Sequence, residues 1–102
     1  MKSIVCNQDI KQCGVCGAKT NLHLHHILFG KNRKKADQDG LTIWLCYQHH
    51  EGKYGIHGKE GHDLDILLKQ KAEKCWMEYY KKSKNDFIKR YGKNYIMEDL
   101  WK

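Results

Sequence analysis

Residue types that bind metals occur as two pairs with the same spacing, Cys13-x-x-Cys16 and Cys46-x-x-His49. Two intervening residues let one backbone turn present both ligands to a single ion, and two such pairs complete the tetrahedral set of a structural zinc site. Closing the loop between them would contribute folding energy to a chain of only 102 residues. We therefore expect structural zinc at these four residues. The alternative is that the cysteines are buried thiols and His49 is a surface residue.

Six histidines remain outside this set: His23, His25, His26, His50, His57 and His62. His50 directly follows His49, so a zinc ion would bring it close to the segment that carries His25 and His26. Imidazoles from separate elements could hold a second cation with positions open for water and phosphate. A neighbouring histidine could then act as a base on the attacking water. His23 would share a strand face with His25 and could assist the metal, but we expect an ordinary strand histidine; His62 should be a local cap or surface residue.

Cations follow the paired histidines at Lys31, Arg33, Lys34 and Lys35, and the chain as a whole carries a formal charge of +7. Such an excess favours a polyanionic partner, most simply DNA or RNA. These four side chains would contact substrate phosphates beside the histidines. The alternative is a solvated loop held open by like charges.

The elements that must position these residues follow from local patterns. Residues 22–29 and 41–46 are typical of strands, with a polar loop from Gly30 to Gly40, so together they predict a long-looped hairpin. A short helix is expected from about Tyr47. Apolar residues at three- and four-residue steps predict a helix from about residue 62, with Trp76 and Tyr79 in the core. A last helix should begin after Asn85 and end at Gly92.

Length predicts a single domain over residues 1–102. Residues 10–60 would hold the zinc knuckle, hairpin and metal-site helix, and residues 62–102 a helical extension. The chain has no apolar run of signal-peptide or transmembrane length, so we expect a cytoplasmic protein without a membrane partner. Five cysteines, an odd count, are then more consistent with metal ligands or free thiols than with disulfides.

The order CxxC, then HHI with a glycine- and cation-rich loop, then LCxxHH, resembles the HNH endonuclease family. The pattern is most similar to its zinc-stapled branch, which includes phage resolvases, phage recombination-enhancing nucleases and small phage-encoded proteins. The resemblance covers about residues 13–57. It implies an α+β fold in which a ββα-metal, treble-clef-like core around the zinc precedes C-terminal helices. It also implies hydrolysis of DNA phosphodiester bonds inside a bacterial cell.

Roles for individual residues follow from this resemblance. His26 corresponds to the general base, and His25 and His50 to ligands of the catalytic metal (Mg²⁺, Mn²⁺, Ni²⁺ or Zn²⁺). His57 corresponds to a further histidine that some members use. Leu41 occupies the position of the family's Asn, which orients the base, so Asn32 or Asp39 would have to substitute.

Two other functions fit the same pattern. The chain could be a catalytically silent zinc module that binds nucleic acid, as the missing Asn favours, or a phage-encoded interaction protein on the same scaffold. An endonuclease of this kind would act as a monomer or homodimer, with a protein partner for targeting as a further option.

Overall fold

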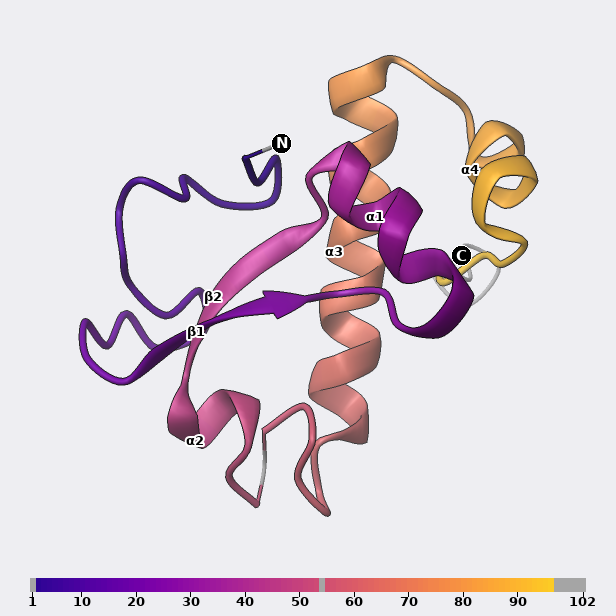
Figure 1. Ribbon diagram of the computed structural model, residues 1–102. Helices are drawn as coiled ribbons and strands as arrows, with labels where there is room; N and C mark the ends of the chain where they lie inside the picture. Colours follow the sequence, from indigo (N-terminus) through magenta and orange to yellow (C-terminus); the bar gives the residue numbers. More distant parts are fainter. Residues whose placement is uncertain (1, 54, 97–102) are drawn as a thin grey trace, which may run out of the picture.

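The computed structural model describes residues 2–53 and 55–96 and has an α+β fold (Figure 1). A two-stranded sheet is combined with helices, as the sequence predicts. In chain order the elements are β1 (Leu22–His26), the 3-10 turn η1 (Gly30–Asn32), α1 (Arg33–Asp39), β2 (Thr42–Cys46), α2 (Tyr47–His50), α3 (His62–Tyr80) and α4 (Lys84–Tyr91).

The two strands pair antiparallel, with Leu22 opposite Cys46, His25 opposite Ile43 and His26 opposite Thr42. Side chains alternate between the faces of a strand, so the adjacent histidines separate. His25 is 2% exposed and faces the interior, whereas His26 is half-buried. The hairpin therefore aims the two rings in different directions.

The connection between the strands differs from the polar loop expected from the sequence. Residues 30–39 form η1 and α1, because the segment consists largely of residues that a helix accepts and Gly40 ends it in the left-handed region (φ 81°). A side chain at Gly40 would collide with the backbone oxygen of Lys2, which passes 2.6 Å from the position of a Cβ. The helix gives the cations and Asp37 fixed directions.

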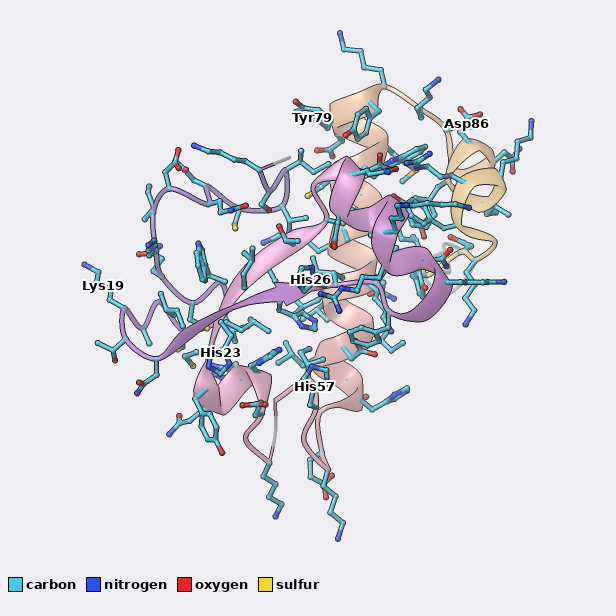
Figure 2. All side chains as sticks on the ribbon, viewed as in Figure 1. Lys19, His23, His26, His57, Tyr79 and Asp86 are labelled. Atoms are coloured by element: carbon cyan, nitrogen blue, oxygen red, sulfur yellow. The ribbon has the colours of Figure 1, made fainter. Side chains whose placement is uncertain are left out.

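The long helix α3 begins where the sequence predicts but buries a narrower stripe. Leu68, Ala72 and Trp76, spaced four residues apart, are buried. Tyr79 is 58% exposed and packs edge-on against Tyr80, so the expectation that it belongs to the core is wrong. Helical spacing keeps Tyr79 on the side of the stripe, but it lies in the last turn of α3, where the rest of the protein covers the helix less (Figure 2).

The last helix, α4, begins two residues earlier than expected and ends as predicted. Ser83 caps it in a reciprocal capping box with Asp86, and Gly92 ends it at φ 78°. Beyond it, Ile96 is buried and the Tyr95 amide donates to Glu73 Oε1 at 2.7 Å. The end of the helical extension predicted over residues 62–102 includes residues 97–102, which lie outside the described residues.

A buried carboxylate, Asp39, joins α1 to the C-terminal helices. Trp76 Nε1 donates to Asp39 Oδ2 at 2.8 Å, and Arg90 Nη2 donates to Oδ1 at 3.0 Å. The hydroxyl of Tyr91 also donates to this carboxylate. Figure 1 shows α1 between the sheet and α4, so this network holds α1 from the side away from β1. Among the described residues, no helix is long and apolar enough to cross a membrane.

Candidate metal centres

The first cluster is built on a tight knuckle before β1. The Gly17 amide donates to the Cys13 carbonyl at 2.9 Å, and Gly17 itself adopts φ 78°, which glycine accepts without strain. The Cys13 amide donates to the Ala18 carbonyl at 2.8 Å, and the Gly14 amide to the Trp44 carbonyl of β2, also at 2.8 Å. These bonds fix Cys13 and Cys16 beside the end of β2, where Cys46 lies.

The ligand atoms of Cys13, Cys16, Cys46 and His49 all lie within 4.8 Å of one another. Cys46 Sγ is 3.2 Å from His49 Nδ1, and Cys16 Sγ is 3.7 Å from Cys46 Sγ. The cluster has the donor set and spacing of a tetrahedral site, so it could bind a metal ion such as zinc.

Backbone hydrogen bonds to the sulfur of Cys13 favour its thiolate form. Burial of the thiol raises its pKa, but backbone groups of Cys46, Cys16 and Val15 that hydrogen-bond the sulfur outweigh this and lower the pKa to about 6. The Val15 amide donates to Cys13 Sγ at 3.4 Å. Because the thiolate is the form that binds metals, the lowered pKa of Cys13 suits a metal ligand rather than an inert buried thiol.

The second cluster joins β1, α2 and the loop that follows α2. Ligand nitrogens of His25, His50 and His57 lie within 4.8 Å of one another. The ring centroids of His50 and His57 are 4.7 Å apart, and His25 lies 5.2 Å from His50. The His57 amide donates to the His50 carbonyl at 2.9 Å, which folds the loop back over α2. The structure thus brings together the three histidines proposed as ligands of a catalytic metal.

The surroundings of this cluster favour the neutral form of His25 and His50. Burial, followed by the neighbouring His50 and His57, lowers the pKa of His25 to about 3. Burial and then His57 and His23 also lower the pKa of His50. Neutral imidazole is the form that binds metals. Moreover, His25 Nε2 is buried with no hydrogen-bond partner among the described residues, as expected of a nitrogen that serves as a ligand.

A fourth histidine, His23, contacts the cluster although the sequence suggested only an ordinary strand residue. Its Nδ1 lies 3.0 Å from His50 Nδ1, so one ring must donate and the other accept. Glu51 Oε2 lies 4.0 Å from the same nitrogen of His23. The three residues form a second group of ligand atoms that shares His50. The alternation that puts His23 on the face of His25 was the available signal.

The proposed base, His26, is held by a carboxylate that the sequence did not single out. Its Nδ1 lies 2.7 Å from Asp37 Oδ1, and Arg33 approaches the other oxygen of Asp37 at 3.8 Å. The two residues suggested as substitutes for the family's Asn have other partners. Asn32 Nδ2 donates to the Tyr91 carbonyl, and Asp39 binds the C-terminal helices. Asp37 could not be singled out from the sequence because its position depends on α1, whose polar pattern predicts a loop.

A hollow of about 280 Å³ joins the second cluster to His26, and we call it the histidine pocket. Phe29 forms one wall and is covered by Lys69, whose Nζ lies 4.5 Å from the ring centroid. In Figure 2, His26 lies on β1, and His57 lies on the loop below it. The pocket is lined by Leu24, His25, His26, Phe29, Gly30, Arg33, His50 and His57.

The four cations proposed to contact phosphates do not act as one group. Arg33 lines the histidine pocket, whereas Lys31 and Lys35 line a separate hollow next to α4. Lys35 Nζ donates to the Arg90 carbonyl at 3.0 Å, and Lys34 is exposed on α1. Only Arg33 therefore stands beside the histidines.

No family model matches the chain, and neither the curated proteins nor the solved structures contain a match.

Proposed function

We propose that this protein is a metal-dependent endonuclease that hydrolyses phosphodiester bonds in DNA, with an HNH-like ββα-metal core. The observation that carries the proposal is the composition of the histidine pocket. Three clustered imidazoles, a fourth histidine held by a carboxylate and an arginine line one open hollow. A surface histidine patch would not require a buried, unpartnered ring nitrogen such as His25 Nε2.

The two clusters fit two different metals. The sulfur-rich set of Cys13, Cys16, Cys46 and His49 suits structural zinc, because all four positions are filled by the protein. The set of His25, His50 and His57 leaves positions for water and phosphate. Nitrogen ligands suit Mn²⁺, Ni²⁺ or Zn²⁺ better than Mg²⁺, which prefers oxygen.

His26 is the group that moves the proton. If Asp37 accepts the proton on Nδ1, the lone pair of Nε2 is left to take a proton from water. The water oxygen then forms a bond to phosphorus while the bond from phosphorus to the 3′ oxygen breaks, and that oxygen takes a proton from solvent. A divalent ion bound by the three imidazoles would supply positive charge for the leaving oxygen. The products carry a 5′-phosphate and a 3′-hydroxyl.

Arg33 and Asp37 adapt this pocket to the reaction. Arg33 reaches the pocket from α1 and can pair with a phosphate oxygen through parallel hydrogen bonds. The buried Leu41 stands where the family has its Asn. We infer that Asp37 replaces that residue, because its carboxylate makes the contact that fixes the base.

The test is conversion of supercoiled plasmid by purified protein in Mn²⁺, Ni²⁺ or Mg²⁺, beside His26→Ala and His62→Ala. His62 is an exposed residue at the start of α3 and lies outside both clusters, so its variant is the matched control. We expect His26→Ala to cut about 10²–10⁴ times more slowly and His62→Ala to cut normally.

Other outcomes would favour the alternative functions. If wild type and His26→Ala are equally inactive but both retard DNA, the protein is a zinc module that binds nucleic acid. If neither cuts nor binds DNA, a protein partner on the same scaffold is the better account.

A further inference from the structure

Two hollows meet where α1 packs beside α4, and we call them together the α1–α4 groove. The larger, about 510 Å³, is bordered by Lys35, Lys82, Lys89 and Arg90, over a floor that includes Trp76. The smaller, about 250 Å³, is bordered by Lys31, Lys35, Lys89 and Arg90. The two hollows share three cations, so they form one continuous basic depression.

The positive charge of the groove is incompletely neutralised. Among the described residues, Lys31, Lys82 and Lys89 form no ion pair. Two carboxylates, Asp39 and Asp86, border the larger hollow, against five cations over the two hollows. Asp39 is bound to Arg90, and Asp86 accepts from the Ser83 amide and hydroxyl, each at 3.0 Å. Ser83 and then the nearby Lys82 and Lys89 lower the pKa of Asp86, so this carboxylate offsets part of the charge.

Two lysines of the η1–α1 segment line one wall of the groove. Lys31 and Lys35 are four residues apart and therefore project from the same side of the η1–α1 segment. Lys35 donates one hydrogen bond to the Arg90 carbonyl, which holds its ammonium group at the groove with donors to spare. Lys89, on α4, borders both hollows from the opposite wall.

The groove adjoins the histidine pocket across a single short segment. Gly30 and Arg33 line the pocket, whereas Lys31, Asn32 and Lys35 line the groove. The segment is fixed in place, because Asn32 is 9% exposed and donates to the Tyr91 carbonyl at 2.9 Å. A chain of phosphates leaving the pocket past Arg33 would meet Lys31 and Lys35 next.

We infer that the α1–α4 groove binds the sugar-phosphate backbone of the DNA strand that enters the histidine pocket. The inference rests on the proposed function and extends it, since it assigns α4 and the end of α3 to substrate binding. Cations repeated along a depression suit a regularly charged polymer, and lysine and arginine contacts of this kind position a nucleic acid without reading its sequence. Lys82 and Lys89 would contact phosphates remote from the bond that is cut.

The experiment measures DNA binding and a small-substrate reaction in parallel, with the full-length chain. The test variant is Lys31→Glu/Lys89→Glu. The control is Lys19→Glu/Lys74→Glu, which changes net charge equally at two exposed residues outside the groove (Lys19 is labelled in Figure 2). Binding of a fluorescent duplex of about twenty base pairs is measured over a range of salt. Hydrolysis of bis(p-nitrophenyl) phosphate, which is too small to reach the groove, reports on the histidine pocket alone.

We expect the test variant to bind the duplex at least tenfold more weakly than the control, with a salt dependence reduced by roughly two phosphate contacts. Its hydrolysis of bis(p-nitrophenyl) phosphate should equal that of wild type. Equal DNA affinity in the two double variants would overturn the inference. A second competitor, polyglutamate, is a polyanion without a sugar-phosphate backbone. If it displaced the labelled duplex from wild type at lower concentrations than unlabelled duplex does, the inference would also be overturned.

Failure of the groove and failure of the proposed function are distinguishable. A wild-type protein that hydrolyses neither substrate, but whose DNA affinity still falls in Lys31→Glu/Lys89→Glu, would refute the endonuclease and support the groove. A protein that hydrolyses both substrates, with affinity unchanged in that variant, would support the endonuclease and refute the groove.

Discussion

Consecutive residues of α2 serve two clusters of different chemistry: His49 completes the cysteine cluster, and His50 belongs to the histidine pocket. The cysteine cluster offers four protein ligands, three of them sulfur, held by short backbone hydrogen bonds. The histidine pocket offers three imidazoles, and its remaining side opens on a hollow lined by His26 and Arg33. A closed ligand set suits a structural ion, and an open one suits a site at which water and substrate can bind.

The two clusters also differ in which parts of the chain hold their ligands in place. The cysteine cluster depends on residues near its own ligands in the chain, such as Gly17 and Ala18. The histidine pocket depends on α1, which the C-terminal helices hold through Asp39 and Asn32. Substitutions should therefore separate folding from activity, with the cysteine cluster controlling folding.

The largest effect is expected from Cys13→Ala. It removes a buried ligand, and because structural zinc contributes on the order of 10 kcal/mol in small zinc domains, the variant should lose its metal and most of its fold. Metal analysis and circular dichroism measure this. The matched control is Cys75→Ala, a half-buried thiol on α3, which should keep the metal and lose about 1 kcal/mol. A Cys13→Ala protein that stays folded with a full zinc content would refute the structural role.

A smaller effect should follow from acid, through His25. Its folded pKa is about 3, below the ordinary value of 6.5, so between these values the unfolded chain binds a proton that the folded chain does not. The stability contributed by the neutral ring is therefore complete above pH 6.5 and falls as the pH drops toward 3. At about pH 4.5 the loss should be roughly 3 kcal/mol.

Urea unfolding of wild type and His25→Leu across this pH range measures the contribution. The leucine variant cannot be protonated at this position, so its stability should fall less steeply with acid. Identical slopes for the two proteins would show that His25 is not held neutral by its surroundings.

Asp37 provides a test at the histidine pocket that leaves the cysteine cluster untouched. Asp37→Ala removes the group that fixes His26 Nδ1 and should slow plasmid cutting by about 10–100-fold, with unchanged zinc content. Asp37→Asn keeps an oxygen that can accept the same hydrogen bond and should lose less. Full activity in Asp37→Ala would contradict the positioning role.

The smallest effect is expected from His23→Ala. The contact between His23 Nδ1 and His50 Nδ1 fixes the orientation of the His50 ring, so its loss should weaken Mn²⁺ binding to the pocket by about tenfold. Titration of plasmid cutting with Mn²⁺ measures this, and excess metal should restore the rate. A variant that stays slow in excess Mn²⁺ would instead place His23 in the reaction itself.

Much of the fold could be predicted because its signals are local. The apolar segments correctly predicted a two-stranded hairpin, and Gly92 correctly marked the end of α4. The helix α1 was missed because it is short and polar outside and buries only Ala36 and Asp39, so its pattern resembles that of a loop. Tyr79 was misplaced because apolar spacing alone does not say how far along α3 the buried stripe extends.

The candidate site also has a part that local spacing predicts and a part that depends on tertiary packing. The cysteine cluster could be predicted, since two-residue spacings within one turn fix the positions of both ligands. The partners of the histidines could not, because the contacts of Asp37 with His26 and of His23 with His50 depend on how α1 and α2 pack against β1. Neither contact has a characteristic spacing in the chain.

The most direct test of the central claim compares plasmid cutting by wild type and His50→Ala at equal zinc content, while Mn²⁺ is titrated. His50 adjoins the cysteine cluster in the chain but contributes only to the histidine groups. We predict that His50→Ala folds and keeps its zinc, yet cuts at least a hundredfold more slowly at every Mn²⁺ concentration. Equal cutting by the two proteins would contradict the assignment of the histidine pocket as the catalytic site.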